Sequence, residues 1–152
     1  MKADLEINKI DLRRFKNLDK RLEAGLKKGL QESMEFVLVE AKSFGGANQL
    51  KIRTGSLRDS INIEVKKEGD YLVGFLGSDS DYAKIHEYGG TITASRAKYL
   101  WFKGDKGWAK VQQVTIPPRP FLRPAIMNNK DEIGRTLLKE GKKGIYGREI
   151  FR

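Results

Sequence analysis

Residues 11–44, DLRRFKNLDKRLEAGLKKGLQESMEFVLVEAKSF, decide how this chain of 152 residues folds. At about 100° per residue, the apolar side chains of the stretch fall on one face of a helix, and charged side chains fall opposite. The pattern predicts one long amphipathic helix, capped by Asp11 and ended by Gly45-Gly46. The apolar face consists of Leu12, Phe15, Leu18, Leu22, Leu26, Leu30, Met34, Val37, Ala41 and Phe44.

The length of this helix raises a packing question. A helix of that span would be about 51 Å long, whereas a compact domain of this size has a radius of gyration of only about 15 Å. We therefore expect the helix to overhang the domain, to bend, or to pack partly on another subunit. Gly25 and Gly29 share a face and mark a bend or a point of close approach, although two merely tolerated glycines are the plainer alternative.

A β-hairpin is predicted over residues 60–77. Ile61, Ile63 and Val65 alternate with polar residues, which indicates a strand with one solvent-facing side. The sequence Lys-Glu-Gly-Asp at 67–70 supplies the turn. Residues 71–76 are apolar on both faces, which predicts the more central strand.

Residues 81–88 are expected to form a short helix with its apolar side chains turned inward. Ser80 or Asp81 would cap it, Gly89-Gly90 would end it, and the inward side chains would be Tyr82, Ile85 and Tyr88. A second extended pair is predicted for residues 99–102 and 111–116, joined by the glycine-rich and charged residues 103–107.

The C-terminal third is predicted to contain an extended segment followed by a last helix. The sequence Pro-Pro-Arg-Pro at 117–120 forces extended geometry, and Pro124 suits the first turn of the helix. The predicted fold is α+β, with a long N-terminal helix and a C-terminal helix packed on a small antiparallel β-sheet. Residues 1–140 would form a single domain, and residues 141–152 a flexible tail.

The amino-acid composition excludes several kinds of functional site. The chain has no cysteine, which excludes disulfides and thiolate sites and suits folding in a reducing cytoplasm. No apolar run approaches the roughly 20 residues that cross a membrane, so we expect a cytoplasmic protein without a membrane partner. The net charge of +10 is compatible with nucleic acid, an acidic protein partner, or plain solubility.

A search for catalytic motifs gives no constellation of nucleophile and base or of metal ligands. Phosphate-binding loops of the GxxxxGK[ST] or GxGxxG form do not occur. Asp79 and Asp81, with Glu87 nearby, could hold magnesium in a nuclease, but a turn that caps the next helix is the simpler reading. His86-Glu87 begins an HExxH-like motif whose second histidine position is Gly90. We predict a non-enzymatic protein with no cofactor, metal or small-molecule substrate.

Residues 96–110 interleave basic and aromatic side chains. Proteins that bind single-stranded nucleic acid use this combination for stacking and phosphate contacts. The alternative is a hairpin with aromatics on a core face and lysines in water, whereas an exposed tryptophan would favour an interface. The residues are Arg96, Lys98, Tyr99, Trp101, Phe102, Lys103, Lys106, Trp108 and Lys110.

Three segments occur in a recognisable order: TGSLRDSI at 54–61, YAKIHEYGGT at 82–91 and IPPRPFLRPA at 116–125. Together they resemble the tail-completion or head–tail joining family of tailed bacteriophages and prophages, whose members are neck and virion-morphogenesis minor structural proteins. The resemblance covers roughly residues 10–140, and the third segment is its most specific part. His86 departs from the apolar or small residue expected there, and residues 92–114 are longer and more aromatic than a minimal member needs.

The resemblance implies a structural virion assembly protein of the head–tail joint. Copies would form a homo-oligomeric ring, commonly sixfold, between neck or adaptor proteins and the tail tube, with DNA passing through. The subunit would be made in the bacterial host cytoplasm and end at the head–tail junction of the virion. A basic nucleic-acid-binding protein and a carboxylate-metal nuclease are the alternative functions.

The resemblance also marks particular residues. Its structural motif residues are Tyr82, Glu87, Tyr88, Gly89, Pro120, Phe121 and Pro124. Phe121, held between two prolines, is expected to be buried and to clamp the extended segment onto the sheet or the long helix. Proline reduces the freedom lost on docking, which suits an interface. The expected assembly residues are Arg119, Arg123, Arg96, Lys98, Lys103, Lys106 and Trp108.

Overall fold

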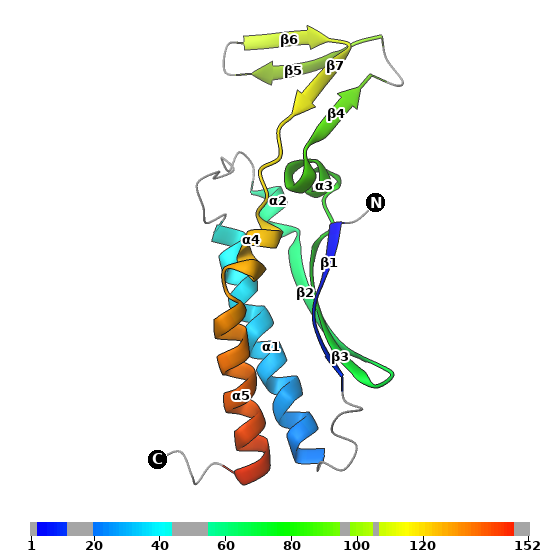
Figure 1. The fold of residues 1–152 in the computed structure, drawn as a ribbon. Coiled ribbons are helices and arrows are strands. Elements are labelled where there is room, and N and C mark those ends of the chain that lie inside the picture. Colours follow the sequence, from blue (N-terminus) through cyan, green and yellow to red (C-terminus); the bar gives the residue numbers. More distant parts are fainter. Residues whose placement is uncertain (1–2, 12–19, 44–54, 95–97, 105–106, 148–152) are drawn as a thin grey trace.

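The structure is a computed structural model, which describes residues 3–11, 20–43, 55–94, 98–104 and 107–147. It has a body of helices packed on a three-stranded sheet, and a narrow arm of short strands that rises from one end of that body (Figure 1). The predicted α+β class is therefore confirmed.

The body sheet is antiparallel, with the strand order β1-β3-β2. Strands β2 (Ile61–Glu68) and β3 (Tyr71–Ser78) form the predicted hairpin, and β3 is central, as expected from its apolar character on both faces. The edge strand β1 (Ala3–Asp11) was not predicted. Asp11 pairs with Tyr71 in this strand, so its predicted role as a helix cap is wrong.

The long helix α1 (Lys20–Ser43) has 24 residues and is about 36 Å long. Its predicted start at residue 11 is wrong because β1 occupies that position, while the predicted end at Gly45-Gly46 lies outside the described residues. Helix α5 (Lys130–Tyr146) packs along α1 within the same chain (Figure 1). This packing covers the helix that we expected to overhang the domain or to seek another subunit.

The predicted last helix is divided into two. Helix α4 (Leu122–Met127) carries Pro124 in its first turn, as expected, and α5 begins three residues after α4 ends. Between them, Asn129 adopts a non-helical backbone and donates its side-chain N–H to the Ala125 carbonyl at 2.7 Å. An asparagine that bonds the backbone in this way competes with the helical ladder. Residue 141, where we placed the start of a flexible tail, lies inside α5, and residues 148–152 lie outside the described part.

Close approach of the two long helices explains the glycines of α1. A Cβ added to Gly25 would lie 2.5 Å from the Glu140 carbonyl oxygen, and one added to Gly29 would lie 3.2 Å from Leu137 Cα. The close-approach interpretation of this pair is therefore confirmed. The buried Glu140 carboxylate on the same seam is bound by Lys28 at 2.8 Å and Lys143 at 2.5 Å.

One core joins α1, the sheet, α4 and α5. Its buried residues come from every part of the body, which makes the body a single packing unit. They are Leu30, Met34, Val37, Ala41, Ile61, Leu72, Leu76, Ala83, Phe121, Leu122, Ala125, Ile126 and Ile133.

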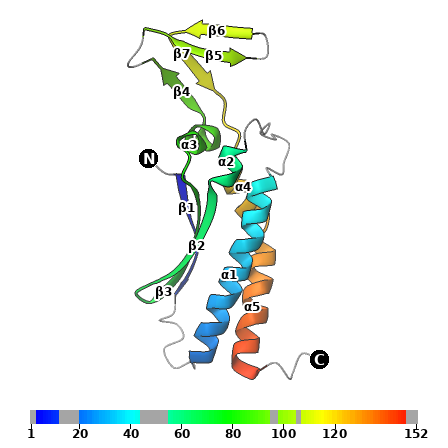
Figure 2. The same cartoon turned by 180° about the vertical axis from the view of Figure 1, so that it is seen from behind.

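Two short helices lie at the end of the body from which the arm rises, α2 (Ser56–Asp59) and α3 (Asp81–Tyr88), and α3 leads into the arm (Figure 1). In the arm, β4 (Gly90–Thr93) pairs with β7 (Gln113–Ile116), and β5 (Leu100–Gly104) pairs with β6 (Gly107–Val111). Of the predicted pairing of 99–102 with 111–116 only Leu100 with Val111 is formed, because the chain bends at Gln112 and residues 113–116 pair with β4 instead. Seen from behind, the arm continues beyond α3, away from α1 and α5 (Figure 2).

Candidate assembly surface

The second and third sequence motifs meet at helix α3. Ser80 caps the helix by accepting the Tyr82 backbone N–H at 3.3 Å, as predicted. Ala83 and Glu87 are the buried residues of α3. Tyr82 is 67% exposed and Tyr88 47% exposed, so the prediction that both rings turn inward is wrong.

Glu87 binds the start of α4 through three backbone N–H groups. Its Oε2 accepts the N–H groups of Phe121 at 2.8 Å and Leu122 at 3.0 Å, and its Oε1 accepts the N–H of Arg123 at 3.0 Å. The first N–H groups of a helix lack partners within the helix, and a carboxylate complements the positive end of the helix dipole. Glu87 therefore acts as a cap supplied from another helix, which we call the Glu87 clasp.

The end of α3 is tied to the same extended segment. The backbone N–H of Arg119 donates to the His86 carbonyl at 2.7 Å. Gly89 ends the helix as expected, with a φ of 70°, and a Cβ at this position would lie 2.8 Å from Pro118 Cδ. Glycine satisfies both the left-handed backbone and the close approach.

Phe121 anchors the segment in the core. Its side chain is 4% exposed and belongs to the hydrophobic core cluster, so the predicted burial is confirmed. Pro120 and Pro124 flank it and are half-buried. The segment is therefore held in two ways: its backbone N–H groups bind Glu87, and its Phe121 ring is buried in the core.

Two arginines leave this fixed segment on the solvent side. Arg119 and Arg123 are exposed, and the Arg123 guanidinium lies 5.6 Å from the centre of the Tyr88 ring, within cation–π range. Tyr88, Arg119 and Arg123 thus form an exposed surface next to the clasp, which we call the Arg-Pro surface. Two of the expected assembly residues are brought together here with the structural motif residues from Glu87 to Pro124, whereas Tyr82 lies at the other end of α3.

His86 lies beneath this surface. Its Nδ1 is buried without a hydrogen-bond partner among the described residues. Burial lowers the pKa of the imidazole below its usual 6.5, and the nearby Arg119 charge lowers it further. The neutral form of the ring is therefore favoured, at the position where the family resemblance led us to expect an apolar or small residue.

The acidic residues of the nuclease alternative do not converge. Glu87 is committed to the clasp, and Asp79 accepts the Asn62 side-chain N–H at 2.9 Å. Asp81 is exposed in the first turn of α3. Within the described residues, no group of three or more His, Asp or Glu side chains is placed to hold a metal ion.

The arm carries the remaining predicted assembly residues. Trp101 is 64% exposed and Trp108 73% exposed, and Lys98 and Lys103 are exposed as well. For the two tryptophans, the interpretation that places the aromatics on a core face is therefore wrong. Arg96 and Lys106 lie outside the described residues.

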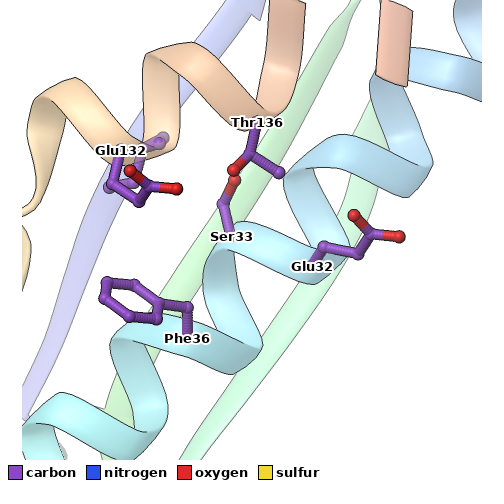
Figure 3. Close-up of a pocket in the computed structure, with 6 residues that line it drawn as sticks. Glu32, Ser33, Phe36, Glu132 and Thr136 are labelled. Carbon is purple, nitrogen blue, oxygen red and sulfur yellow. The ribbon is translucent and has the colours of Figure 1, made fainter. Parts of the chain in front are cut away.

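A small pocket lies on the body between α1 and α5, away from the sequence motifs. Its lining is Glu32, Ser33, Phe36, Glu132, Ile133 and Thr136, and Figure 3 shows the Ser33 and Thr136 side chains pointing toward one another across the helix pair. Sequence reasoning missed this pocket, since it depends on the pairing of two helices about 100 residues apart.

In the part of the chain that the structure describes, no helix is both long and apolar enough to span a membrane. No match was found among curated proteins or among solved structures. The family model of the phage virion morphogenesis family matches residues 39–142, which is more than half of the chain and includes all three sequence motifs. The chain therefore belongs to the phage virion morphogenesis family.

Proposed function

We propose that the chain is a non-enzymatic structural subunit of the head–tail joint of a tailed phage or prophage. Copies form a ring, commonly sixfold, that contacts neck or adaptor proteins and the tail tube and lets DNA pass through. Assembly takes place in the host cytoplasm, and the subunit ends at the head–tail junction. Family membership supports the assembly role.

The observation that carries the proposal is the Glu87 clasp. Three charge-assisted hydrogen bonds hold the backbone of residues 121–123, and the Phe121 ring holds its other side. Arg119 and Arg123 are exposed on a segment that has little freedom left to lose, and the exposed Tyr88 ring of α3 lies against Arg123. Preorganisation of this kind increases affinity for a partner, and arginine and tyrosine are common among residues that dominate interfaces.

The test is assembly of the purified full chain. Light scattering coupled to size-exclusion chromatography, followed by negative-stain electron microscopy, should show a closed ring at high protein concentration or with purified tail-tube protein. A protein that stays monomeric with both, or that hydrolyses DNA or RNA in a magnesium-dependent manner lost in Asp81→Ala, would refute the proposal.

Nucleic-acid binding is the second candidate, favoured by the exposed tryptophans interleaved with lysines on the arm. Stacking and phosphate contacts would use this combination. Affinity for oligonucleotides that falls steeply with salt, without ring formation, would select this function, since phosphate contacts release counterions.

A further inference from the structure

Strands β4 and β7 at the base of the arm each have one open backbone edge. Among the described strands they pair only with each other (Figure 1). In an antiparallel pair, residues that bond the partner strand alternate with residues whose N–H and C=O groups point away from it. The Ala94 N–H donates to the Gln112 carbonyl at 2.9 Å just beyond the ladder, so this pair belongs to the bonded set. Counting in twos from it, the residues with outward backbone groups are Thr91 and Thr93 of β4 and Gln113 and Thr115 of β7.

The composition of these two edge strands is that of strands inside a sheet. Charged residues make up 33% of the chain, yet β4 (GTIT) and β7 (QVTI) contain none. Charged side chains are a common protection of edge strands against pairing, and β1, β2, β5 and β6 each carry at least one. The third uncharged strand among those described is β3, which has a neighbour on both sides. The sequences of β4 and β7 therefore suit strands that also have two neighbours.

We infer that the open edge of β7 in one copy pairs with the open edge of β4 in the next copy, so that neighbouring arms join into one continuous sheet. Because β4 and β7 are antiparallel within the chain, rotation of identical copies gives the repeating order β4-β7-β4-β7, which is antiparallel throughout. The inference rests on the proposed ring and names its subunit contact. The two edges differ, so the contact is head-to-tail, and a closed ring leaves no edge unpaired.

Electrostatics favours these edges as the place where identical chains meet. Copies that each carry a net charge of +10 repel one another. At uncharged edges the backbones can approach without placing like charges on directly opposite residues. Four-residue edges pair weakly in a single contact, but the last contact of a ring forms within one particle at a high effective concentration. Short edges therefore suit a closed ring better than a dimer.

The base of the two strands is already oriented in the single chain. Strand β4 begins directly after Gly89, and β7 leads to Arg119, whose backbone N–H binds the His86 carbonyl. The Glu87 clasp fixes the residues that follow. Because the edges are held in position before they meet a partner, little freedom is lost on pairing.

Amide hydrogen exchange tests whether the outward N–H groups find partners. In the dilute full chain, the N–H groups of Thr91, Thr93, Gln113 and Thr115 should exchange rapidly, and they should become protected in concentrated, assembled protein. The N–H groups of Ile92 and Val114 face each other inside the ladder, so their exchange should change less.

Introduced cysteines test which edges meet, since the chain has none of its own. Chains with Thr91→Cys or Thr93→Cys, mixed with chains that carry Gln113→Cys or Thr115→Cys, should form mixed disulfide dimers on mild oxidation. Paired strands bring cysteines within the range that a disulfide spans. Two chains with the same substitution should not cross-link, because β4 meets β7 and not another β4. Glu64→Cys, at an exposed site on β2, should not cross-link with Thr115→Cys.

A proline variant tests the contact without cysteines. Thr93→Pro removes an outward N–H group and leaves the ladder within the chain intact, as prolines in natural edge strands do. Self-association should weaken about tenfold or more. Thr93→Val keeps the N–H group and should change self-association less than about twofold. Circular dichroism shows whether each variant is folded.

The outcomes separate the contact from the ring. Rings that form with none of the mixed disulfides, or that form equally well from folded Thr93→Pro chains, would overturn the contact and leave the ring proposal standing. Disulfides between like variants would overturn it in favour of a twofold pairing. Protection that requires purified tail-tube protein, without mixed disulfides, would assign the edges to that protein. A chain that stays monomeric at every concentration, with and without tail-tube protein, would overturn both contact and ring.

Discussion

Gly25 of α1 and Gly144 of α5 face each other where the two long helices approach most closely. A Cβ on Gly25 would lie 3.2 Å from Gly144 Cα, and a Cβ on Gly144 would lie 3.3 Å from Gly25 Cα. Each position therefore requires the other to lack a side chain. The two helices touch through their backbones at this point, and the seam extends toward Gly29 and Gly141.

Alanine at either end of this glycine pair should destabilise the fold. The added Cβ would meet the Glu140 carbonyl oxygen from Gly25 or the Arg21 carbonyl oxygen from Gly144, and backbone cannot move aside cheaply. We expect a loss of about 1–3 kcal/mol in the free energy of unfolding, measured by urea denaturation. Gly134→Ala is the matched control: a Cβ there meets nothing within 4 Å, and the change should stabilise α5 by about 0.5–1 kcal/mol. Equal effects at the three positions would contradict the close-packed seam.

Loss of the buried Glu87 carboxylate should lower the free energy of unfolding, because three backbone N–H groups depend on it. Glu87→Ala leaves the N–H groups of residues 121–123 without their acceptor in a largely buried site, at about 1–3 kcal/mol for each donor that stays unsatisfied. We expect a loss of at least about 3 kcal/mol by thermal or urea unfolding, and a smaller loss for Glu87→Gln, which keeps one acceptor oxygen. An unchanged melting curve for Glu87→Ala would show that water replaces the clasp.

Phe121→Ala should destabilise the protein by about 3–5 kcal/mol, since it empties a buried site next to Leu122. Met127, at the other end of α4, is 52% exposed and provides the comparison. Met127→Ala should change the free energy of unfolding by no more than about 0.5 kcal/mol. A small effect at Phe121 would mean that the extended segment is held by the Glu87 clasp alone.

Arg119→Ala and Arg123→Ala should separate folding from assembly. Both side chains are exposed, so each variant should melt within about 0.5 kcal/mol of the parent chain. Ring formation should be lost if these arginines contact a neighbouring subunit or a tail protein. Arg135→Ala, an exposed arginine on α5 paired with Glu132 in its own helix, controls for loss of one positive charge. A large fall in the stability of the monomer would instead assign the two arginines to the fold.

Acidic pH should destabilise the packing of α1 on α5, because it protonates the Glu140 carboxylate that binds Lys28 and Lys143. Hydrogen bonds from Lys143 and Lys28 lower the pKa of this buried carboxyl below its usual 4.5. The group therefore contributes stability that is complete above pH 4.5 and is lost as the pH falls through the lower pKa of the folded state. Urea unfolding between pH 6 and pH 2.5 should show this slope, and Glu140→Gln should flatten it. Glu35→Gln, at an exposed position of α1, should leave it unchanged.

The sequence alone predicts those elements whose characteristic pattern lies within their own residues. The hairpin of β2 and β3 follows from alternation and a glycine turn, and Ser80 follows from its place before α3. Strand β1 was missed although Leu5 and Ile7 alternate with polar residues: no element was predicted for residues 3–10, and only Asp11 was assigned to the helix. Two competing periodicities meet there, and pairing with β3 decides the outcome.

The candidate surface could be predicted only in part. Burial of Phe121 follows from a large ring between prolines, but a glutamate on a short helix gives no sign that it binds N–H groups 34 residues away. Tyr82 and Tyr88 are exposed because Ala83 and Glu87 occupy the buried face of α3. The arm pairing was mistaken because local sequence does not state which strand is the partner.

The pairing of α1 with α5 also orders events during synthesis. The apolar stripe of α1 leaves the ribosome before α5, which covers it and follows about 100 residues later. A nascent chain therefore carries α1 without its partner helix while the sheet and the arm are translated, and chaperones can bind the uncovered stripe during that time. A product that stops before α5 lacks the packed helix pair.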